Sequence, residues 1–183
     1  MFNVLSRRRT VFVVLNTLFF DCIFLGVLLS QFLYTPFRYT SESLGILGLD
    51  WPWMISAIFL LNLVLSGFVM LTLPGLVFFP LSAVVLAIRG VLWGIMLNQT
   101  SIVPFWLVLP TFVLEGEGYV LASVAGTILG LSWLEPNWTY KDKHLSRLDA
   151  LKMALREALC LLFLGAIFLF LAAVVEALTI ISA

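Results

Sequence analysis

Six polar side chains lie inside stretches of the chain that are otherwise as apolar as a membrane span. They are Asp21, Asn62, Arg89, Glu115, Glu117 and Glu176. Ionisable groups within spans are costly, usually face the bundle interior and often mark a function. Carboxyl groups there could bind a cation or proton, lock helices together by pairing with the arginine, or act as catalytic acids and bases. The residue types leave ion binding and helix locking open as alternatives. They give no support to catalysis.

The charges of this group cannot all be neutralised within it, because it holds one arginine and several acids. An ion pair of Arg89 with Glu115 or with Asp21 is expected, since either charge alone would be left in a medium of low dielectric. The remaining acids are expected to be protonated, to meet water, or to hydrogen-bond backbone freed by Gly116 and Gly118.

Motifs for other chemistry are missing from the sequence. It contains no HExxH, no GxSxG, no phosphate-binding loop and no nucleic-acid module. Cys22 and Cys160 are too far apart in sequence for a metal-ligand spacing and are read as small buried apolar residues. The sole histidine, His144, lies in a polar loop. We therefore predict no catalytic residues, no metal, no cofactor and no nucleic-acid partner.

The composition indicates the class of protein in which these six polar side chains lie. Of 183 residues, 62% are hydrophobic and 11% are charged, which is outside the range of soluble domains. A span needs about 20 apolar residues. We predict one all-α integral membrane domain over residues 1–183, a polytopic bundle with spans near 11–34, 51–73, 75–97, 102–133 and 160–182. Pro74 and Gly75 mark the boundary between the second and third spans.

The basic residues predict how the bundle is oriented. Arg7, Arg8 and Arg9 precede the first span, and a second group lies between the fourth and fifth: Lys141, Lys143, Arg147, Lys152 and Arg156. Five crossings place both groups on one side, which the positive-inside rule makes cytoplasmic. We expect a multi-pass protein of the cell membrane with its N-terminus in the cytoplasm and its C-terminus outside.

The fourth apolar segment is too long for one upright span at 1.5 Å per residue. Two crossings would place the second basic group outside the cell, against the positive-inside rule. We therefore predict a single crossing with a broken or re-entrant leader near Pro104 and Pro110.

The segment 141–158 predicts an amphipathic helix that lies at the interface and leads into the last span. Ser146 and Asp149 have the spacing of an N-terminal cap. Leu148, Leu151, Leu155 and Leu159 fall on one face, away from most of the basic residues. Docking of a cytoplasmic protein on this helix is an alternative use.

Small residues predict how the helices pack. "GVLWG" contains Gly90 and Gly94, and "GTILG" contains Gly126 and Gly130. Both have the GxxxG spacing that lets membrane helices approach closely. Packing within one chain is favoured, and a homo-oligomer remains an alternative.

These pieces occur in an order that resembles one family. The second span reads "FLLNLVLSGFVMLTLPG", the third "LSAVVLAIRGVLWGIML", the fourth "PTFVLEGEGYVLASVAGTILG" and the last "LAAVVEALT". From the second span onward, the chain resembles the stage II sporulation protein M family of small multi-pass membrane proteins. It departs from the family pattern at Thr111 and Phe112, where His-Gly is usual, and at Glu117, which is an added acid.

The resemblance implies a role but no chemistry. Founding members of the family are scaffolds for peptidoglycan-remodelling enzymes during engulfment of the forespore, and many relatives occur in prokaryotes that never sporulate. We therefore expect a non-catalytic membrane protein that recruits membrane or cytoplasmic protein partners. The alternative is a small transporter or channel component that uses its intramembrane carboxylates for a cation, proton or small solute.

Overall fold

The computed structural model describes residues 2–32, 50–99, 105–140 and 145–182, and every element in these ranges is a helix. The helices long and apolar enough to cross a membrane number 5 among the described residues, so the predicted all-α membrane bundle is confirmed. In chain order the elements are α1 (Phe2–Arg7), α2 (Arg9–Ser30), α3 (Trp51–Leu60), η2 (Leu61–Thr72), α4 (Leu73–Val77), α5 (Phe79–Gln99), α6 (Phe105–Leu134), α7 (Pro136–Thr139) and α8 (Arg147–Ser182).

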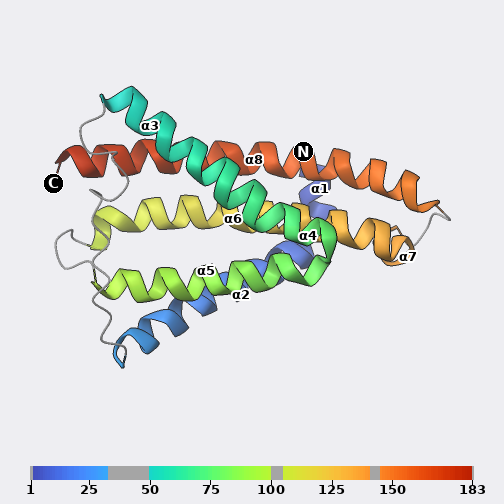
Figure 1. Cartoon of the computed structure of the whole chain (residues 1–183), viewed down its shortest axis with the longest axis horizontal. Helices are drawn as coiled ribbons and strands as arrows, with labels where there is room; N and C mark the ends of the chain where they lie inside the picture. Colours follow the sequence, from blue (N-terminus) through green and yellow to red (C-terminus); the bar gives the residue numbers. More distant parts are fainter. Residues whose placement is uncertain (1, 33–49, 100–104, 141–144, 183) are drawn as a thin grey trace.

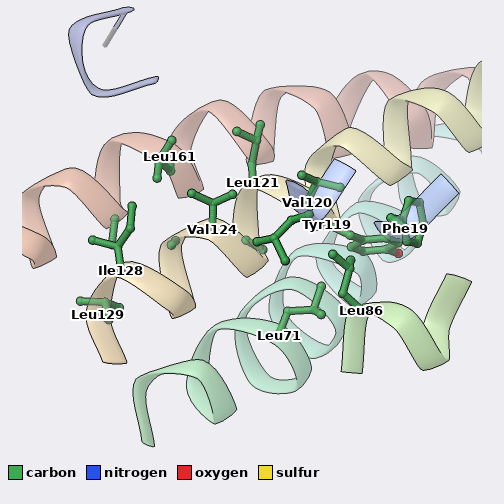
Figure 2. Packing of buried hydrophobic residues seen from close by; sticks show 14 of the residues in the cluster. Phe19, Leu71, Leu86, Tyr119, Val120, Leu121, Val124, Ile128, Leu129 and Leu161 are labelled. Carbon is green, nitrogen blue, oxygen red and sulfur yellow. The ribbon is translucent and has the colours of Figure 1, made fainter. Parts of the chain in front are cut away.

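Helix α6 is the centre of the bundle, with α8 along one side and α5 and α2 along the other (Figure 1). In its membrane-spanning window 78% of the residues are buried, against 17% to 33% for the other spans. Figure 2 shows Tyr119, Leu121 and Val124 of this helix packed among residues of its neighbours, including Phe19 and Leu86. The outer faces of the surrounding helices expose large apolar side chains, as the lipid-facing surface of a membrane bundle does.

Tryptophans lie at both ends of the bundle. Trp51 and Trp53 are exposed at the start of α3, and Trp133 and Trp138 are exposed at the opposite end, near α7 (Figure 1). Tryptophan is enriched where a membrane meets water, because its ring is apolar and its N–H is polar. The two pairs therefore indicate where the hydrocarbon region ends on each side.

The second and third spans meet at Phe78, four residues after the predicted boundary. Phe78 has an extended backbone (φ −148°, ψ 111°), and the helix before it runs through Pro74 and Gly75. Pro74 is the second residue of α4, directly after η2, and lies inside a continuous helix that runs from Trp51 to Val77. The residues before α4 form a π-helix, η2, which no sequence pattern predicted.

The fourth segment is one helix of 30 residues with Pro110 inside it, so the predicted break at Pro110 is wrong. Pro110 lies in the second turn, where the one carbonyl it leaves unpaired belongs to the start of the helix. At 1.5 Å per residue α6 is about 45 Å long, which exceeds a hydrocarbon core of about 30 Å. The length is therefore taken up by tilt or by ends that extend beyond the hydrocarbon. Pro104 lies outside the described residues, and a break there stays a prediction.

The last span and the predicted amphipathic helix are one continuous helix, α8, of 36 residues. The described part of that segment is therefore not a separate interfacial helix. Ser146 and Asp149 form the predicted cap, with the Asp149 amide donating to Ser146 Oγ at 3.3 Å. In this part of α8 the alanines Ala150 and Ala154 face the bundle and Leu155 is exposed. Small residues are inside because α8 packs closely along α6.

The two predicted GxxxG pairs lie at two different helix contacts. Gly90 and Gly94 lie against α2, where Gly94 meets the backbone of Gly26. Gly126 and Gly130 lie against the region from η2 to the start of α5, where Gly130 meets the backbone of Gly75. All four glycines thus face helices of the same chain, at distances that leave no room for a side chain.

The arginines before the first span are joined to α8. Glu157 is buried and receives hydrogen bonds from Arg7 Nη1 at 3.1 Å and Arg8 Nε at 2.9 Å. Arg8 also donates to the Thr139 carbonyl at 3.1 Å and lies over the ring of Tyr140. Burial and the nearby Glu157 carboxylate raise the pKa of Tyr140. Arg7 and Arg8 are therefore at the same end of the bundle as the described members of the second basic group, as the four crossings between the two groups require.

The glycine contacts lead to a test of packing. A methyl group at Gly126 would lie 2.9 Å from the carbonyl oxygens of Leu71 and Thr72. We expect Gly126→Ala to lower the free energy of unfolding by about 1–3 kcal/mol, because backbone atoms must move apart. Thermal unfolding in detergent, followed by tryptophan fluorescence, measures this. Gly67→Ala is the control, because its methyl group would have neighbours at 3.4 Å or more. Equal losses in the two variants would contradict the prediction.

The buried Glu157 leads to a second test. Glu157→Gln leaves Arg8, whose side chain is 12% exposed, without its counter-charge. Removing one partner of a buried pair costs about 3 kcal/mol or more, and we expect a loss of that size in detergent unfolding. Asp149→Asn is the matched control: its exposed pair with Lys152 at 3.9 Å contributes about 1 kcal/mol or less, and asparagine can still accept the cap hydrogen bond from Ser146 Oγ. A Glu157→Gln variant as stable as Asp149→Asn would show that the pair does not hold the N-terminal helices.

Candidate functional site: an intramembrane polar cluster

The hydroxyl of Tyr119 is the centre of a polar cluster inside the bundle. Arg89 Nη2 donates to it at 2.7 Å, and the hydroxyl lies 2.8 Å from Asn62 Oδ1. It also contacts Glu115 Oε1. A hydroxyl has one hydrogen and two lone pairs, so Tyr119 accepts from the arginine and donates to either the amide or the carboxyl group. One phenol therefore joins groups from three helices.

Local helix geometry brings these groups together. Glu115 and Tyr119 are four residues apart on α6 and so lie on one face. Asn62 is the second residue of η2, and Arg89 is in the middle of α5. Tyr119 is 0% exposed and Glu115 is 8% exposed, so the cluster is enclosed by the helices that supply it.

Arg89 is held by aromatic rings and does not form a direct ion pair. Its guanidinium carbon lies 4.0 Å from the centre of the Tyr119 ring and 5.8 Å from that of Trp93, one turn along α5. The guanidinium is favoured over such rings because their faces carry partial negative charge. Within the described residues neither Glu115 nor Asp21 is within ion-pair distance of Arg89. The predicted direct pair is therefore replaced by a path from Arg89 through Tyr119 to Glu115.

The other predicted acids take three different places. Glu176 of α8 is partly buried and close enough for its charge to act on Glu115. Glu117 lies away from Tyr119 and receives hydrogen bonds from Asn16 Nδ2 of α2, at 3.0 Å to each carboxylate oxygen. Asp21 is exposed on α2. The six predicted residues therefore make a core cluster of Asn62, Arg89 and Glu115 with Glu176 nearby, a separate α2–α6 contact at Glu117, and one outward acid.

The sequence analysis missed two members of these contacts. Tyr119 is one helical turn after Glu115, which is the available sequence signal, but a tyrosine in an apolar helix usually indicates packing alone. Asn16 is the first polar residue of the predicted first span, and nothing in its sequence neighbourhood indicates Glu117 as its partner. Among the described residues no group of three or more His, Cys, Asp and Glu could hold a metal ion. His144 lies outside the residues that the structure describes.

The arrangement can hold a guanidinium in low dielectric, against a phenol that also contacts a carboxyl group. The model of the family described as Stage II sporulation protein M matches residues 17–179, which include the whole core cluster. The chain belongs to the stage II sporulation protein M family. Comparison with curated proteins and with solved structures gave no match. In this family member the match begins at residue 17, in the first span, whereas the sequence motifs indicated a resemblance only from the second span onward.

The core cluster of this stage II sporulation protein M family member leads to a test of the Tyr119 hydroxyl. Tyr119→Phe keeps the ring and leaves the donor and acceptor groups of Arg89, Asn62 and Glu115 without their shared partner. Each buried polar group left unsatisfied costs about 1–3 kcal/mol, and we expect a loss of at least that size in detergent unfolding.

The control removes a buried hydroxyl that holds nothing together. Ser123 is on the same helix and is 0% exposed, and its hydroxyl has no hydrogen-bond partner among the described residues. Ser123→Ala should leave the free energy of unfolding within about 1 kcal/mol of the parent. If Tyr119→Phe is no less stable than Ser123→Ala, the hydroxyl does not join the helices.

Proposed function

We propose that this member of the stage II sporulation protein M family is a non-catalytic membrane protein that organises partner proteins through the outer surfaces of its helices. The observation that supports this is the closed core cluster. Arg89, Asn62 and Glu115 meet at a hydroxyl that is 0% exposed. Groups that carry an ion across a membrane must meet each side in turn, whereas groups satisfied by one another fix the position of helices. The resemblance to founding members suggests wall-remodelling enzymes as partners.

We propose further that the N-terminus is cytoplasmic and the C-terminus is outside. The support is the position of the basic residues: Arg7 and Arg8 are bound to Glu157, in the same part of α8 as Lys152 and Arg156. Basic residues favour the cytoplasmic side of a membrane. Any wall-remodelling partner would then act at the end where α3 begins and α8 ends.

Transport is the second candidate, and Glu117 is the observation that favours it. Its partner Asn16 lines a groove of about 400 Å³ on α2, together with Phe12, Thr17 and neighbouring residues. A partly buried carboxylate beside a groove can take up and release a proton or cation.

Reconstituted vesicles distinguish the two candidates. With a proton or sodium gradient imposed, we expect vesicles containing the protein to leak no faster than protein-free vesicles, because the core acids are enclosed. Flux that exceeds this background and is lost in Glu117→Gln, while Ser123→Ala retains it, would establish transport instead.

The organiser role is tested in the native membrane. A photo-crosslinking residue is placed at the outward positions Phe24 on α2, Val84 on α5 and Phe163 on α8, all at least 50% exposed. We expect a defined protein adduct from at least one of these positions, and none from the buried position Val124 used as control. Absence of adducts from all three outward positions would overturn the organiser role.

A further inference from the structure

Helix α2 presents an acid to the lipid at mid-depth. Asp21 is exposed and follows Arg9, the first residue of α2, by about 18 Å of helix. Its neighbours Phe19 and Cys22 pack against Gly90 of α5, so Asp21 is level with Arg89 and the core cluster. A carboxylate that faces hydrocarbon at this depth is costly. A basic group on a neighbouring helix would remove this cost.

The surface around Asp21 has the form of a helix contact. Val13, Thr17, Phe24 and Leu28 are exposed on the same face of α2 as Asp21, at spacings of three to four residues. A groove of about 400 Å³ borders this face, and Val13 and Thr17 belong to both, while Phe12, Asn16 and Phe20 line its other side. We name the exposed residues Val13, Thr17, Asp21, Phe24 and Leu28 the α2 face. It is an apolar stripe with one acid and one hydroxyl in the middle.

A second copy of the chain is a poor occupant of the α2 face. Copies inserted in the same direction have each residue at the same depth, so a symmetric pair would bring Asp21 against Asp21. Among the described residues, the basic side chain at this depth is Arg89, and its guanidinium is already bound by Tyr119 and lies over two rings. Arg89 is therefore engaged inside the bundle, and within the described residues no other basic side chain is level with Asp21 to balance the acid.

We propose that the α2 face binds a transmembrane helix of a different protein that carries one lysine or arginine at mid-membrane depth. Charge complementarity is the reason: the face holds Asp21, with Glu117 behind Asn16 on its inner side, and no basic residue. The apolar residues pack against the partner helix, and the ammonium or guanidinium group donates to the Asp21 carboxylate and the Thr17 hydroxyl. This inference rests on the proposed organiser function and narrows it to one face and one partner chemistry.

The test uses a synthetic helix of about 20 leucines and alanines with one central lysine. The full-length protein is reconstituted in vesicles, and binding is measured by energy transfer from a donor on the protein to an acceptor on the peptide. We expect the lysine peptide to bind about tenfold more tightly than the same peptide with leucine at the centre, since an interhelical polar contact is worth about 1–2 kcal/mol. Asp21→Asn should remove the difference, and Asp21→Glu should retain it.

Matched variants locate the contact. Asp149→Asn removes an exposed acid far from α2 and should leave the binding of the lysine peptide unchanged. A peptide with its lysine near one end should bind no better than the leucine peptide. The inference is overturned if the lysine and leucine peptides bind equally, or if Glu117→Gln and not Asp21→Asn removes the preference. It is also overturned if two labelled copies associate with each other through Asp21.

The photo-crosslinking experiment separates this inference from the function on which it rests. Adducts from Val84 or Phe163 without any from Phe24 would leave the organiser role standing and remove the α2 face from it. Absence of adducts from all three positions would remove the role itself. Adducts from Phe24 that disappear in Asp21→Asn, with those from Val84 unchanged, are the expected result.

Discussion

An arginine at mid-depth in a membrane bundle constrains everything placed around it. Arg89 is in the middle of α5, where hydrocarbon offers no hydrogen-bond acceptor, so rings and acceptors from other helices surround it. The structure does this with Tyr119, which offers its ring face and its hydroxyl to the same guanidinium. Since Tyr119 also meets Asn62 and Glu115, the position of α5 fixes η2 and α6 as well. The same set of contacts that satisfies one charge thus orders three helices.

Close helix packing makes this cluster geometrically possible. In lipid the hydrophobic effect does not drive helices together, so much of their association comes from van der Waals packing at small residues that permit backbone contact. Gly94 brings α5 onto α2, and Gly126 brings the turn region near Gly75 onto α6. Gly118 of α6 has no room for a side chain because Leu169 of α8 fills the space. With its neighbours this close, α6 is enclosed, and Tyr119 is shielded from lipid and water.

The sequence predicted the class, the number of spans and most of the cluster, because those follow from composition and from polarity in an apolar context. It did not predict Tyr119, whose role depends on three helices converging. It grouped Glu115 with Glu117, although residues two apart on a helix point about 200° apart and so serve different neighbours. It placed a turn at Pro74 and a break at Pro110. Pro74 lies within the continuous helix Trp51–Val77, and Pro110 lies in the second turn of α6, so neither proline ends a helix.

Residues two apart on a helix point in nearly opposite directions. For this reason α2 has one side chain in the core and another on the surface at the same depth. Phe19 faces inward, where its ring packs against Trp93 at 5.7 Å and fills the space beside Gly116. Asp21, two residues later, must then face outward. Asp21 therefore does not belong to the core cluster. For its carboxylate to reach Arg89, α2 would have to rotate, and this would withdraw Phe19 from the core. Packing of one aromatic ring thus places an acidic side chain on the membrane-facing surface, where the basic group of another helix can pair with it.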